Sequence, residues 1–474
     1  MQNRLLGIDR YILQTQKELD FRTKKISKLV WDYALPGIVG PMVNVLYNVV
    51  DRIFIGQGVG PLAISGLAIT FPVLNLTSSL GMLVGAGAAA RISISLGKQD
   101  KLTAEQILGN SLLLTVVLNA VFITLFMIFL DPILIAFGAS ELTLPYARGY
   151  LQIVLLGNVF VSLCYNFNAM MRASGYPKKA MITMLIGAIL NLILTPLFLF
   201  GFNLGMPGVA WSTVLSMFIG MLFVMHHFTR RDSAIRLQWK HVRFNRKIVF
   251  AILSIGLSPF SMQVAASGVA VLMNTSLMRY GGDLAVGAYG IINTIMMLLI
   301  MSVMGLNQGT QPIIGYNYGA RDFKRVRETF FYSAKVATLI TFAGFLIGQF
   351  LPRLLSSAFT TDAQLIDITE RGIRFAVAAL PLVGIQIVAS SFFQSLGYAA
   401  KSIIQSLSRQ LIFLVPGLII FPRLWGLDGV WAAIPIADTL AAVLSIYLLT
   451  IQMRLLKRME KEDKLTPKAG SRSG

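Results

Sequence analysis

Long apolar blocks separated by short polar segments run through the whole chain of 474 residues. Blocks such as Ile107–Leu130 and Met181–Phe200 have about the 20 apolar residues that a helix needs to cross the hydrocarbon core of a bilayer. The pattern predicts twelve such helices. We expect them near residues 31–55, 62–90, 105–130, 144–171, 178–201, 208–229, 248–278, 284–314, 328–351, 368–396, 402–424 and 430–453.

Composition agrees with membrane spanning. The chain is 55% hydrophobic and 13% charged, whereas an average soluble domain is about 25% charged. So few charges cannot cover the polar surfaces of soluble domains of this total length. The net charge of +20 does not indicate nucleic-acid binding, because the basic residues lie in short loops and no basic amphipathic domain carries them.

The basic residues also orient the chain. They gather before the first predicted span and in alternate loops such as residues 230–247, whereas Gly56–Pro61 and Phe202–Pro207 are uncharged and Phe359–Glu370 is net acidic. Loops rich in Lys and Arg stay in the cytoplasm. We therefore expect a multi-pass protein of the bacterial inner membrane, with both termini cytoplasmic and an even number of spans.

The two halves of the chain repeat each other. Short motifs at loops and helix ends recur at a shift of 221 or 222 residues: Gly60–Ala63 with Gly282–Ala285, Leu96–Asp100 with Tyr318–Asp322, Ala173–Ala180 with Ser395–Ser402, and Gly208–Trp211 with Gly429–Ala432. Matches in order at one shift indicate internal duplication. Because each half has six spans, we expect a pseudo-two-fold axis along the membrane normal, as in transporters that bind ligands near the midplane.

The predicted organisation is an all-α membrane protein of two six-helix bundles. It comprises a cytoplasmic N-terminal tail (1–30), an N-terminal bundle (31–229), a cytoplasmic linker (230–247), a C-terminal bundle (248–455) and a cytoplasmic tail (456–474). Within the first tail, Arg10–Lys28 alternates charged and apolar residues. This segment is either a helix on the membrane surface or a solvated tail.

A charge inside a membrane span is costly and marks a functional site by default. Asp51 lies on the first predicted span, where Asn44, Tyr47, Asn48 and Asp51 follow the i, i+3, i+4, i+7 spacing of one helical stripe. Such a stripe faces protein or a water-filled cavity. Asp51 is therefore a candidate for carrying a proton or binding a cation; alternatively, it pairs with Arg52 at the interface.

Other polar groups inside the predicted spans are mostly neutral. Asp438 is the acidic residue inside a span of the second half, and is either a second acidic site or tied by hydrogen bonds to a neighbouring helix. Neutral groups usually join helices, but Asn191 and Thr195 lie one turn apart and can supply oxygens to a cation beside Asp51. Methionines are flexible and polarizable, and our candidates for lining a substrate cavity are Asn44, Asn48, Gln263, Gln311 and Met297.

The sequence contains no Walker, HExxH or GxSxG motif. We therefore expect neither an enzyme nor a bound cofactor. The single cysteine, Cys164, allows no disulfide within the chain. The three histidines lack acidic partners at the spacing of zinc ligands, so we expect no metal site beyond the cation alternative at Asp51.

Three stretches resemble the multidrug and toxic compound extrusion (MATE) family, in its bacterial DinF-like branch: Leu46–Gly56, Met171–Met181 and Gln308–Gly319. The resemblance covers roughly residues 30–455. It implies two six-helix bundles that form a V-shaped cavity, and export of organic cations or other amphipathic compounds in exchange for H⁺ or Na⁺. We expect small amphipathic or cationic molecules and membrane lipid as partners, and a monomer.

The resemblance also implies an acidic cation site in the N-terminal half, at Tyr47, Asp51, Asn191, Thr195 and Thr213. Similar proteins usually carry a second carboxylate in an Asn-x-x-x-Asp-Pro run, where this chain reads Asn191-Leu-Ile-Leu-Thr195-Pro196. Loss of that charge should weaken Na⁺ binding and leave Asp51 as the sole acid of this site. In the second half, Met273 stands at the position that repeats Asp51, so we expect coupling mainly in the first half.

Two other functions stay open at the level of sequence. A lipid or lipid-linked oligosaccharide flippase of a related two-bundle family would often have basic residues that hold phosphates in a central cavity. We find almost no Lys or Arg inside the predicted spans, apart from helix-end residues such as Arg52 and Arg91. A passive channel or a membrane scaffold would differ from a transporter in failing to move a solute against its gradient.

Overall fold

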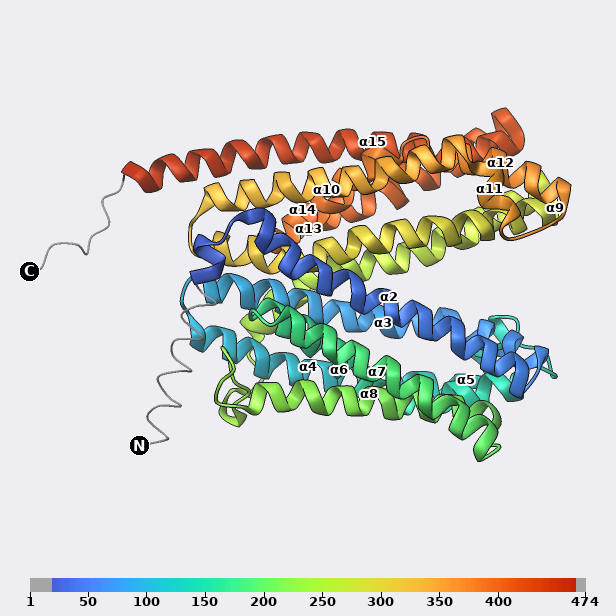
Figure 1. Cartoon of the computed structure of the whole chain (residues 1–474), viewed down its shortest axis with the longest axis horizontal. Helices are drawn as coiled ribbons and strands as arrows, with labels where there is room; N and C mark the ends of the chain where they lie inside the picture. Colours follow the sequence, from blue (N-terminus) through green and yellow to red (C-terminus); the bar gives the residue numbers. More distant parts are fainter. Residues whose placement is uncertain (1–18, 466–474) are drawn as a thin grey trace, which may run out of the picture. The chain divides into compact units, whose positions relative to one another are not determined.

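The computed structural model describes residues 19–465 and is almost entirely helical, with no strand in that range (Figure 1). The α-helices are α2 (Ile26–Gly58), α3 (Pro61–Gly97), α4 (Lys101–Ile128), α5 (Leu130–Ala136), α6 (Leu144–Ala173), α7 (Pro177–Pro196), α8 (Gly205–Thr229), α9 (Arg246–Gly319), α10 (Phe323–Phe350), α11 (Pro352–Ser357), α12 (Ala363–Val377), α13 (Leu380–Ser395), α14 (Ala399–Leu407) and α15 (Val415–Leu465). Two π-helical segments, η1 (Leu197–Gly201) and η3 (Ser408–Leu414), and a 3₁₀ turn, η2 (Trp239–His241), complete the described chain. The predictions for residues 1–18 and 466–474 lie outside it.

Nine helices in residues 19–465 are long and apolar enough to cross a membrane, and α12 with α13 form a tenth span that is bent by 51°. Two of the nine each contain two helices, because the backbone leaves helical geometry at Gly282 inside α9 and at Gly426 inside α15. Both glycines have a positive φ, which side-chain-bearing residues rarely adopt. Divided there, the described chain has twelve membrane-length segments, and the predicted all-α membrane protein is confirmed.

The duplication seen in the sequence is present in the backbone. Positive φ angles, which are uncommon outside glycine, recur at the same shift of 221 or 222 residues. The matched pairs are Gly60 with Gly282, Gln99 with Arg321, Gly175 with Gly397, and Gly205 with Gly426. Helix caps recur as well: Asp100 and Asp322 each accept a hydrogen bond of 3.0 Å from the backbone N–H three residues further on. The two halves therefore make the same turns with the same local chemistry.

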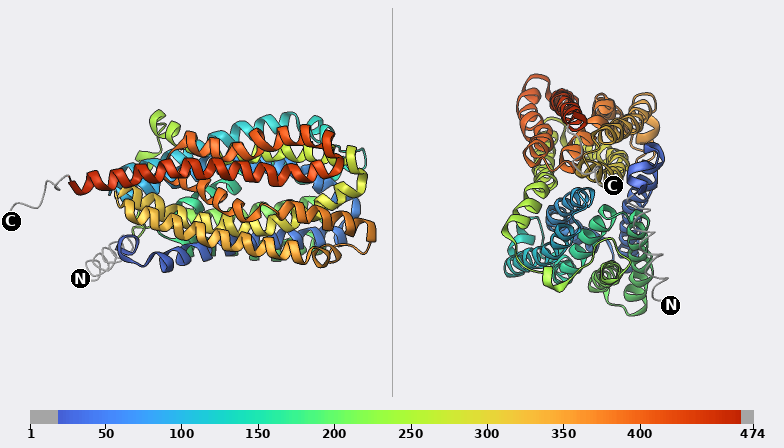
Figure 2. Two further views of the ribbon diagram at one scale, coloured as in Figure 1. Left: turned by 90° about the horizontal axis from the view of Figure 1, so that it is seen from above. Right: turned by 90° about the vertical axis from the view of Figure 1, so that its left-hand side faces the viewer.

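The described helices form two compact units. Unit 1 comprises Asp32–Ile92 and Asp100–Val264, and unit 2 comprises residues 19–31, Ser93–Gln99 and 265–465. In each unit the helices run roughly side by side, as the views in Figure 2 show. Each unit is built mainly from one half of the duplicated sequence, although the end of α3 belongs to unit 2 and the start of α9 to unit 1.

The loop at residues 230–247 is folded against α4 within unit 1. Glu105 is 5% exposed and accepts hydrogen bonds from the backbone N–H of Arg236 (3.1 Å) and from Nε2 of Gln238 (2.7 Å). Asn110, on the same helix, accepts from the backbone N–H of Asn245 at 2.8 Å. This segment is therefore an ordered part of unit 1 as well as the connection between the two halves of the sequence.

The described ends of the chain lie together on unit 2, beside the start of α10. Arg325 donates to the backbone carbonyls of Phe21 (3.0 Å) and Lys24 (2.7 Å), and Phe21 stacks on Tyr316. Arg327 forms a salt bridge of 2.7 Å with Glu460 near the end of α15. Residues 21–24 and Glu460 therefore lie at one end of unit 2. Residues 21–24 pack against other residues of the protein. That this end is cytoplasmic stays a prediction.

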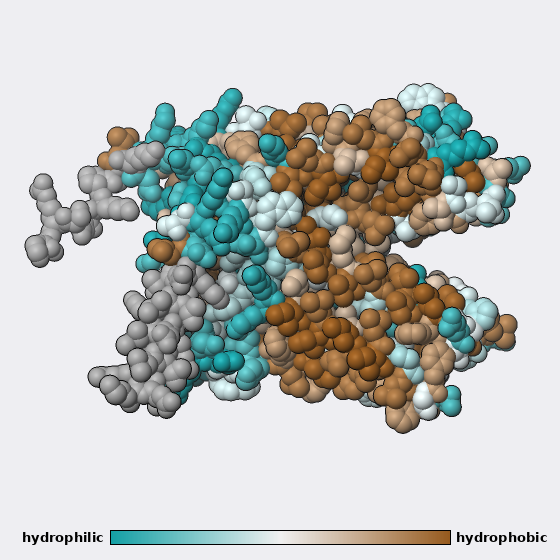
Figure 3. Space-filling model, in the orientation of Figure 1, coloured by the Kyte–Doolittle hydropathy of each residue, from teal (hydrophilic) through white to brown (hydrophobic). Residues whose placement is uncertain are grey.

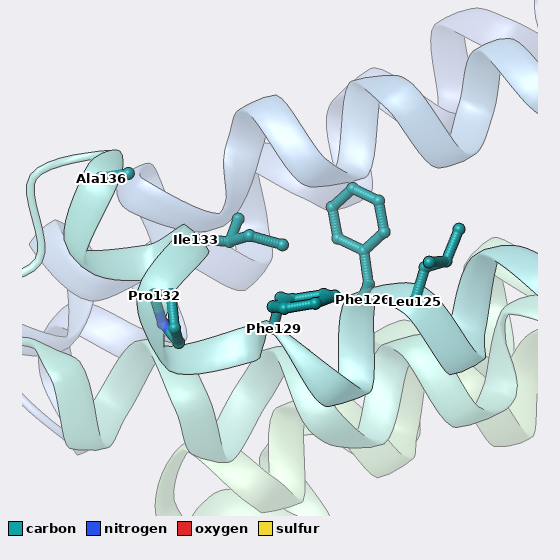
Figure 4. A pocket seen from close by; sticks show the side chains of 6 residues that line it. All are labelled: Leu125, Phe126, Phe129, Pro132, Ile133 and Ala136. Atoms are coloured by element: carbon teal, nitrogen blue, oxygen red, sulfur yellow. The ribbon is translucent and has the colours of Figure 1, made fainter.

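On the face shown in Figure 3, hydrophobic residues cover the middle of the surface and hydrophilic residues gather toward its two ends. Large exposed hydrophobic residues include Leu46, Val117, Phe250 and Phe350. Where α4 ends and α5 begins, an open groove of about 400 Å³ is lined by Leu125, Phe126, Phe129, Pro132, Ile133 and Ala136 (Figure 4). Each of these side chains is apolar, so the groove suits hydrocarbon and offers no polar group to a ligand.

Glycines allow a close helix crossing within unit 2. A Cβ on Gly97 would lie 1.9 Å from the carbonyl oxygen of Tyr316, and a Cβ on Gly319 would lie 2.1 Å from that of Ile94. The contact is reciprocal, because residues 94 and 97 repeat as 316 and 319 at the shift of 222. The crossing therefore depends on the same glycine in both copies of the repeat.

Replacement of Gly97 by alanine is expected to destabilise the protein, because a methyl group cannot fit against a backbone carbonyl unless a helix moves. Overpacking of this kind costs about 1–3 kcal/mol. Gly81→Ala on the same helix is the control, since its Cβ would meet Oδ1 of Asn166 at an ordinary 3.7 Å. Thermal unfolding of the purified variants measures the difference, and equal unfolding midpoints would contradict the close crossing.

Candidate functional site

Asp51 lies in a buried polar cluster within unit 1. It is on α2 and is 7% exposed. Oγ1 of Thr195, on α7, donates a hydrogen bond of 2.9 Å to Asp51 Oδ1. Within the described part of the chain, no salt bridge joins Asp51 to Arg52, whose side chain is exposed. The carboxylate is therefore compensated by neutral groups of neighbouring helices instead of by the adjacent arginine.

The side-chain amide of Asn191 faces both oxygens of Asp51. In the orientation that the hydrogen-bonding pattern requires, its Nδ2 donates to Oδ1 and Oδ2, each at 3.1 Å. The other end of the amide lies 3.4 Å from Oγ1 of Thr213 on α8. Asn191 is one helical turn before Thr195, which explains why both reach the same carboxylate. The structure thus brings Asp51, Asn191, Thr195 and Thr213 together, as the resemblance implies.

Ser212 completes the cluster, although neither spacing nor the family resemblance indicates it. Its Oγ lies 2.7 Å from Oγ1 of Thr195 and 2.8 Å from the carbonyl oxygen of Val209. Ser212 has one hydroxyl proton, which it donates either to the Val209 carbonyl or to Thr195, whose own proton goes to Asp51. Ser212 and Thr213 are neighbours about 100° apart on α8, and only the packing of α8 against α7 decides which one faces Thr195.

The polar stripe predicted on α2 divides into enclosed and open positions. Tyr47 and Asp51 are buried, whereas Asn48 is exposed and donates a hydrogen bond of 2.6 Å to the backbone carbonyl of Asn44. Nδ2 of Asn44 donates to the hydroxyl of Tyr165 on α6 at 2.9 Å. Helical spacing therefore places the four residues on one side of α2, but the neighbouring helices determine which of them are enclosed.

A small cavity lies beside Asn44. Its volume of about 10 Å³ is close to that needed for one water molecule. It is lined by Asn44, Cys164, Tyr165, Asn168, Thr183, Met184, Gly187 and Met217. All of these residues belong to unit 1, so the cavity lies inside that unit, between α2, α6, α7 and α8.

An apolar layer covers the cluster beyond Asp51. Ile55, one turn further along α2, is fully buried and belongs to a core cluster with Tyr150, Leu199, Met206 and Val209. A layer of this kind excludes water and lowers the local polarity, which strengthens the hydrogen bonds to a carboxylate. Asp51 therefore has hydrogen-bond donors on one side and buried apolar side chains on another.

The donors around Asp51 determine what the cluster can do chemically. Thr195 and Asn191 point hydrogen atoms at the carboxylate, so they satisfy its negative charge without a metal ion. Among the described residues, no group of three or more His, Cys, Asp or Glu side chains is arranged to hold a metal. Hydrogen bonds of this kind stabilise the ionised carboxylate, and a carboxylate in this setting can also take up a proton.

Asp438 is also buried, but its partner is a cation. It is 2% exposed on α15 and forms a salt bridge with Nε of Arg409, which lies in the π-helical segment η3. Arg409 falls inside the predicted span 402–424, so the near absence of basic residues from the spans has an exception there. π-Helical segments are frequent at functional sites, which makes this ion pair a second place of interest.

The remaining cavity candidates are distributed over both units. Gln263 belongs to unit 1, whereas Met297 and Gln311 belong to unit 2. Met297 is 46% exposed. Nε2 of Gln311 is buried and has no hydrogen-bond partner among the described residues. Their part in a substrate cavity stays a prediction.

Comparison with known proteins gives a consistent picture. Residues 36–197 and 259–419 each match the sequence model of the MatE family, so the match occurs once in each half of the repeat. The chain is 30% identical over 435 residues to "Multidrug export protein MepA" of Staphylococcus aureus (strain N315), covering 90% of this chain and 95% of the relative. Solved structures are also similar to this chain. The structure of the MATE multidrug transporter DinF-BH, determined as a complex, has 37% sequence identity and a TM-score of 0.84. The match covers 90% of this chain and 96% of that structure's chain. A crystal structure of MATE in the bent conformation has 25% identity and a TM-score of 0.88, over 94% and 99%.

Proposed function

Because this chain belongs to the MATE family of multidrug efflux transporters, we propose that it exports amphipathic organic cations in exchange for protons, with Asp51 as the group that carries the proton. The observation that supports proton coupling is the set of donors around Asp51. Thr195 and Asn191 contribute hydrogen bonds to the ionised carboxylate, and the second carboxylate usual in similar proteins is replaced by Thr195. One acid among neutral donors is a poor Na⁺ site and a suitable proton site.

Proton binding at Asp51 would change how α2 is held. The ionised carboxylate accepts charge-assisted hydrogen bonds from α7, which are roughly twice as strong as neutral ones. Protonation removes that charge and weakens the contacts of α2 with Thr195 and Asn191. A proton that binds one arrangement of α2 more tightly than another shifts the population between them, and that is the physical basis of coupling in this proposal.

The proposal places the protein in the bacterial inner membrane as a monomer with both termini in the cytoplasm. Two observations support the orientation. Basic residues are concentrated in alternate loops, and residues 21–24 and 460 lie at one end of unit 2. Small cationic or amphipathic molecules and membrane lipid are the partners that this location implies.

The pairing of Arg409 with Asp438 argues against the alternative function, a lipid-linked oligosaccharide flippase. A carrier of phosphate groups needs cationic side chains that are free to pair with them. Arg409 lies inside the predicted span 402–424, and it is already paired with Asp438. The ion pair is neutral overall, so it provides no net positive charge for a pyrophosphate.

Asp51→Asn keeps the size of the side chain and one acceptor oxygen but cannot change its protonation state. We expect it to reduce transport driven by a pH gradient by more than about tenfold, since a group that does not titrate cannot couple to protons. Uptake of a cationic dye into liposomes, with the pH gradient imposed in Na⁺-free buffer, measures this. Asp131→Asn is the control, because Asp131 pairs with Arg148 in a partly exposed salt bridge of 3.4 Å. Wild-type transport by Asp51→Asn would remove Asp51 from the mechanism.

Thr195→Asp should give the site a second carboxylate. It replaces the hydroxyl that donates to Asp51 with two oxygens that can bind a cation. Hard monovalent and divalent cations prefer oxygen ligands with negative charge. We therefore expect transport by this variant to become stimulated by Na⁺, while the wild type and a Thr195→Val control respond to pH alone. The measurement is dye transport at constant pH with and without a Na⁺ gradient. Equal Na⁺ responses in all three proteins would show that the missing charge does not set the ion preference.

A further inference from the structure

The residues that line the small cavity of unit 1 have counterparts in unit 2 whose side chains are far more polar. The repeat shift of 222 residues, or 221 for the last pair, maps Cys164 onto Gln386, Thr183 onto Gln405, Gly187 onto Arg409 and Met217 onto Asp438. The first member of each pair lines the cavity beside Asn44. Small or apolar residues in the first half are thus replaced by amides, a guanidinium and a carboxylate in the second.

Contacts inside unit 2 support this correspondence. In unit 1, a Cβ on Gly187 would lie 3.9 Å from Cε of Met217, and in unit 2 their counterparts Arg409 and Asp438 form a salt bridge. Ser390 and Ser406, the counterparts of two further cavity residues, lie with their hydroxyl oxygens 2.8 Å apart. Corresponding helices therefore meet at the same repeat positions in both units, but the side chains at these contacts are different.

Unit 2 has acceptor oxygens at these positions that the protein does not use. Gln386 is 5% exposed and Gln405 is 1% exposed. Oε1 of each is buried and has no hydrogen-bond partner among the described residues. Nε2 of Gln405 is held by Ser445, which leaves the carbonyl end of that amide for another donor. These two amide oxygens and the carboxylate of Asp438 stand at repeat positions whose counterparts line one cavity in unit 1. Together they form a set of acceptors that matches an N–H-bearing cation.

We propose that unit 2 contains a cation site made by Asp438 with Gln386 and Gln405, and that Arg409 is its tethered occupant. The site is suited to a guanidinium, amidinium or primary ammonium group, whose several N–H donors pair with carboxylate and amide oxygens. Exchange of Arg409 for such a group keeps Asp438 compensated, whereas removal of any cation leaves a buried charge unpaired, which is strongly unfavourable. The site is separate from Asp51 and does not depend on proton coupling.

Chemical replacement of the arginine side chain tests this proposal. Arg409→Ala removes the tethered cation and places a small residue there, as Gly187 does in the first half. Millimolar guanidinium should then raise the thermal unfolding midpoint of the variant by about 2 °C or more, because a ligand that binds only the folded state stabilises it. Urea at the same concentration has a similar shape without the charge, and it should leave the midpoint unchanged.

The double variant Arg409→Ala with Asp438→Asn is the matched control, since it lacks both the tethered cation and the carboxylate. It should show no response to guanidinium, and the wild type, whose site is filled by Arg409, should respond at least tenfold more weakly than Arg409→Ala. Arg409→Gln, which is longer and neutral, serves as the second variant if the alanine protein does not fold. Identical midpoints with and without guanidinium in whichever single variant is folded, or an equal response in the double variant, would overturn the proposal and leave a structural ion pair only.

Discussion

Hydrocarbon does not solvate charge, so each carboxylate that the chain carries into the membrane must be compensated by other groups of the protein. Asp51 and Asp438 are compensated in different ways. Asp51 accepts hydrogen bonds from Thr195 and Asn191, which are neutral, and Asp438 pairs with the guanidinium of Arg409. A carboxylate held by neutral donors keeps its charge available to a proton. A carboxylate paired with a cation is already neutralised. In our proposal, it can exchange that cation for another one.

The two units share a repeated backbone, although their buried carboxylates have different partners. Helix caps at Asp100 and Asp322, positive φ angles at Gly60 and Gly282, and the reciprocal crossing of Gly97 and Gly319 recur at one shift. These features fix where helices begin, bend and touch. They involve backbone geometry and van der Waals contact, which tolerate few alternatives, whereas side chains that line internal spaces are free to diverge between the copies. The protein therefore has one scaffold used twice with two kinds of buried site.

Much of the candidate site in unit 1 was predictable because its members are unusual for their surroundings. Asp51 is conspicuous as a carboxylate in an apolar block, and Asn191 and Thr195 stand one turn apart on another. Ser212 and Tyr165 were not predictable in the same way, since a hydroxyl inside a span usually bonds its own helix and carries no sign of its partner. Arg409 lies in the span 402–424 and stands out by charge, but its partner Asp438 is 29 residues away on another helix, and sequence spacing does not pair residues across helices.

The sequence by itself determined which segments are helical and that the halves are copies, because apolar block length, capping residues and glycine positions act locally along the chain. It did not show that the predicted span 368–396 is two helices, α12 and α13, with a bend of 51°. It also determined which residues bring charge into the membrane. The tertiary structure decided what each of those charges meets. Whether Asp51 faces Arg52 or Thr195, and whether Asp438 faces solvent or Arg409, depends on the rotation and packing of whole helices against one another, and that arises from many weak contacts summed over the unit and not from any one stretch of sequence.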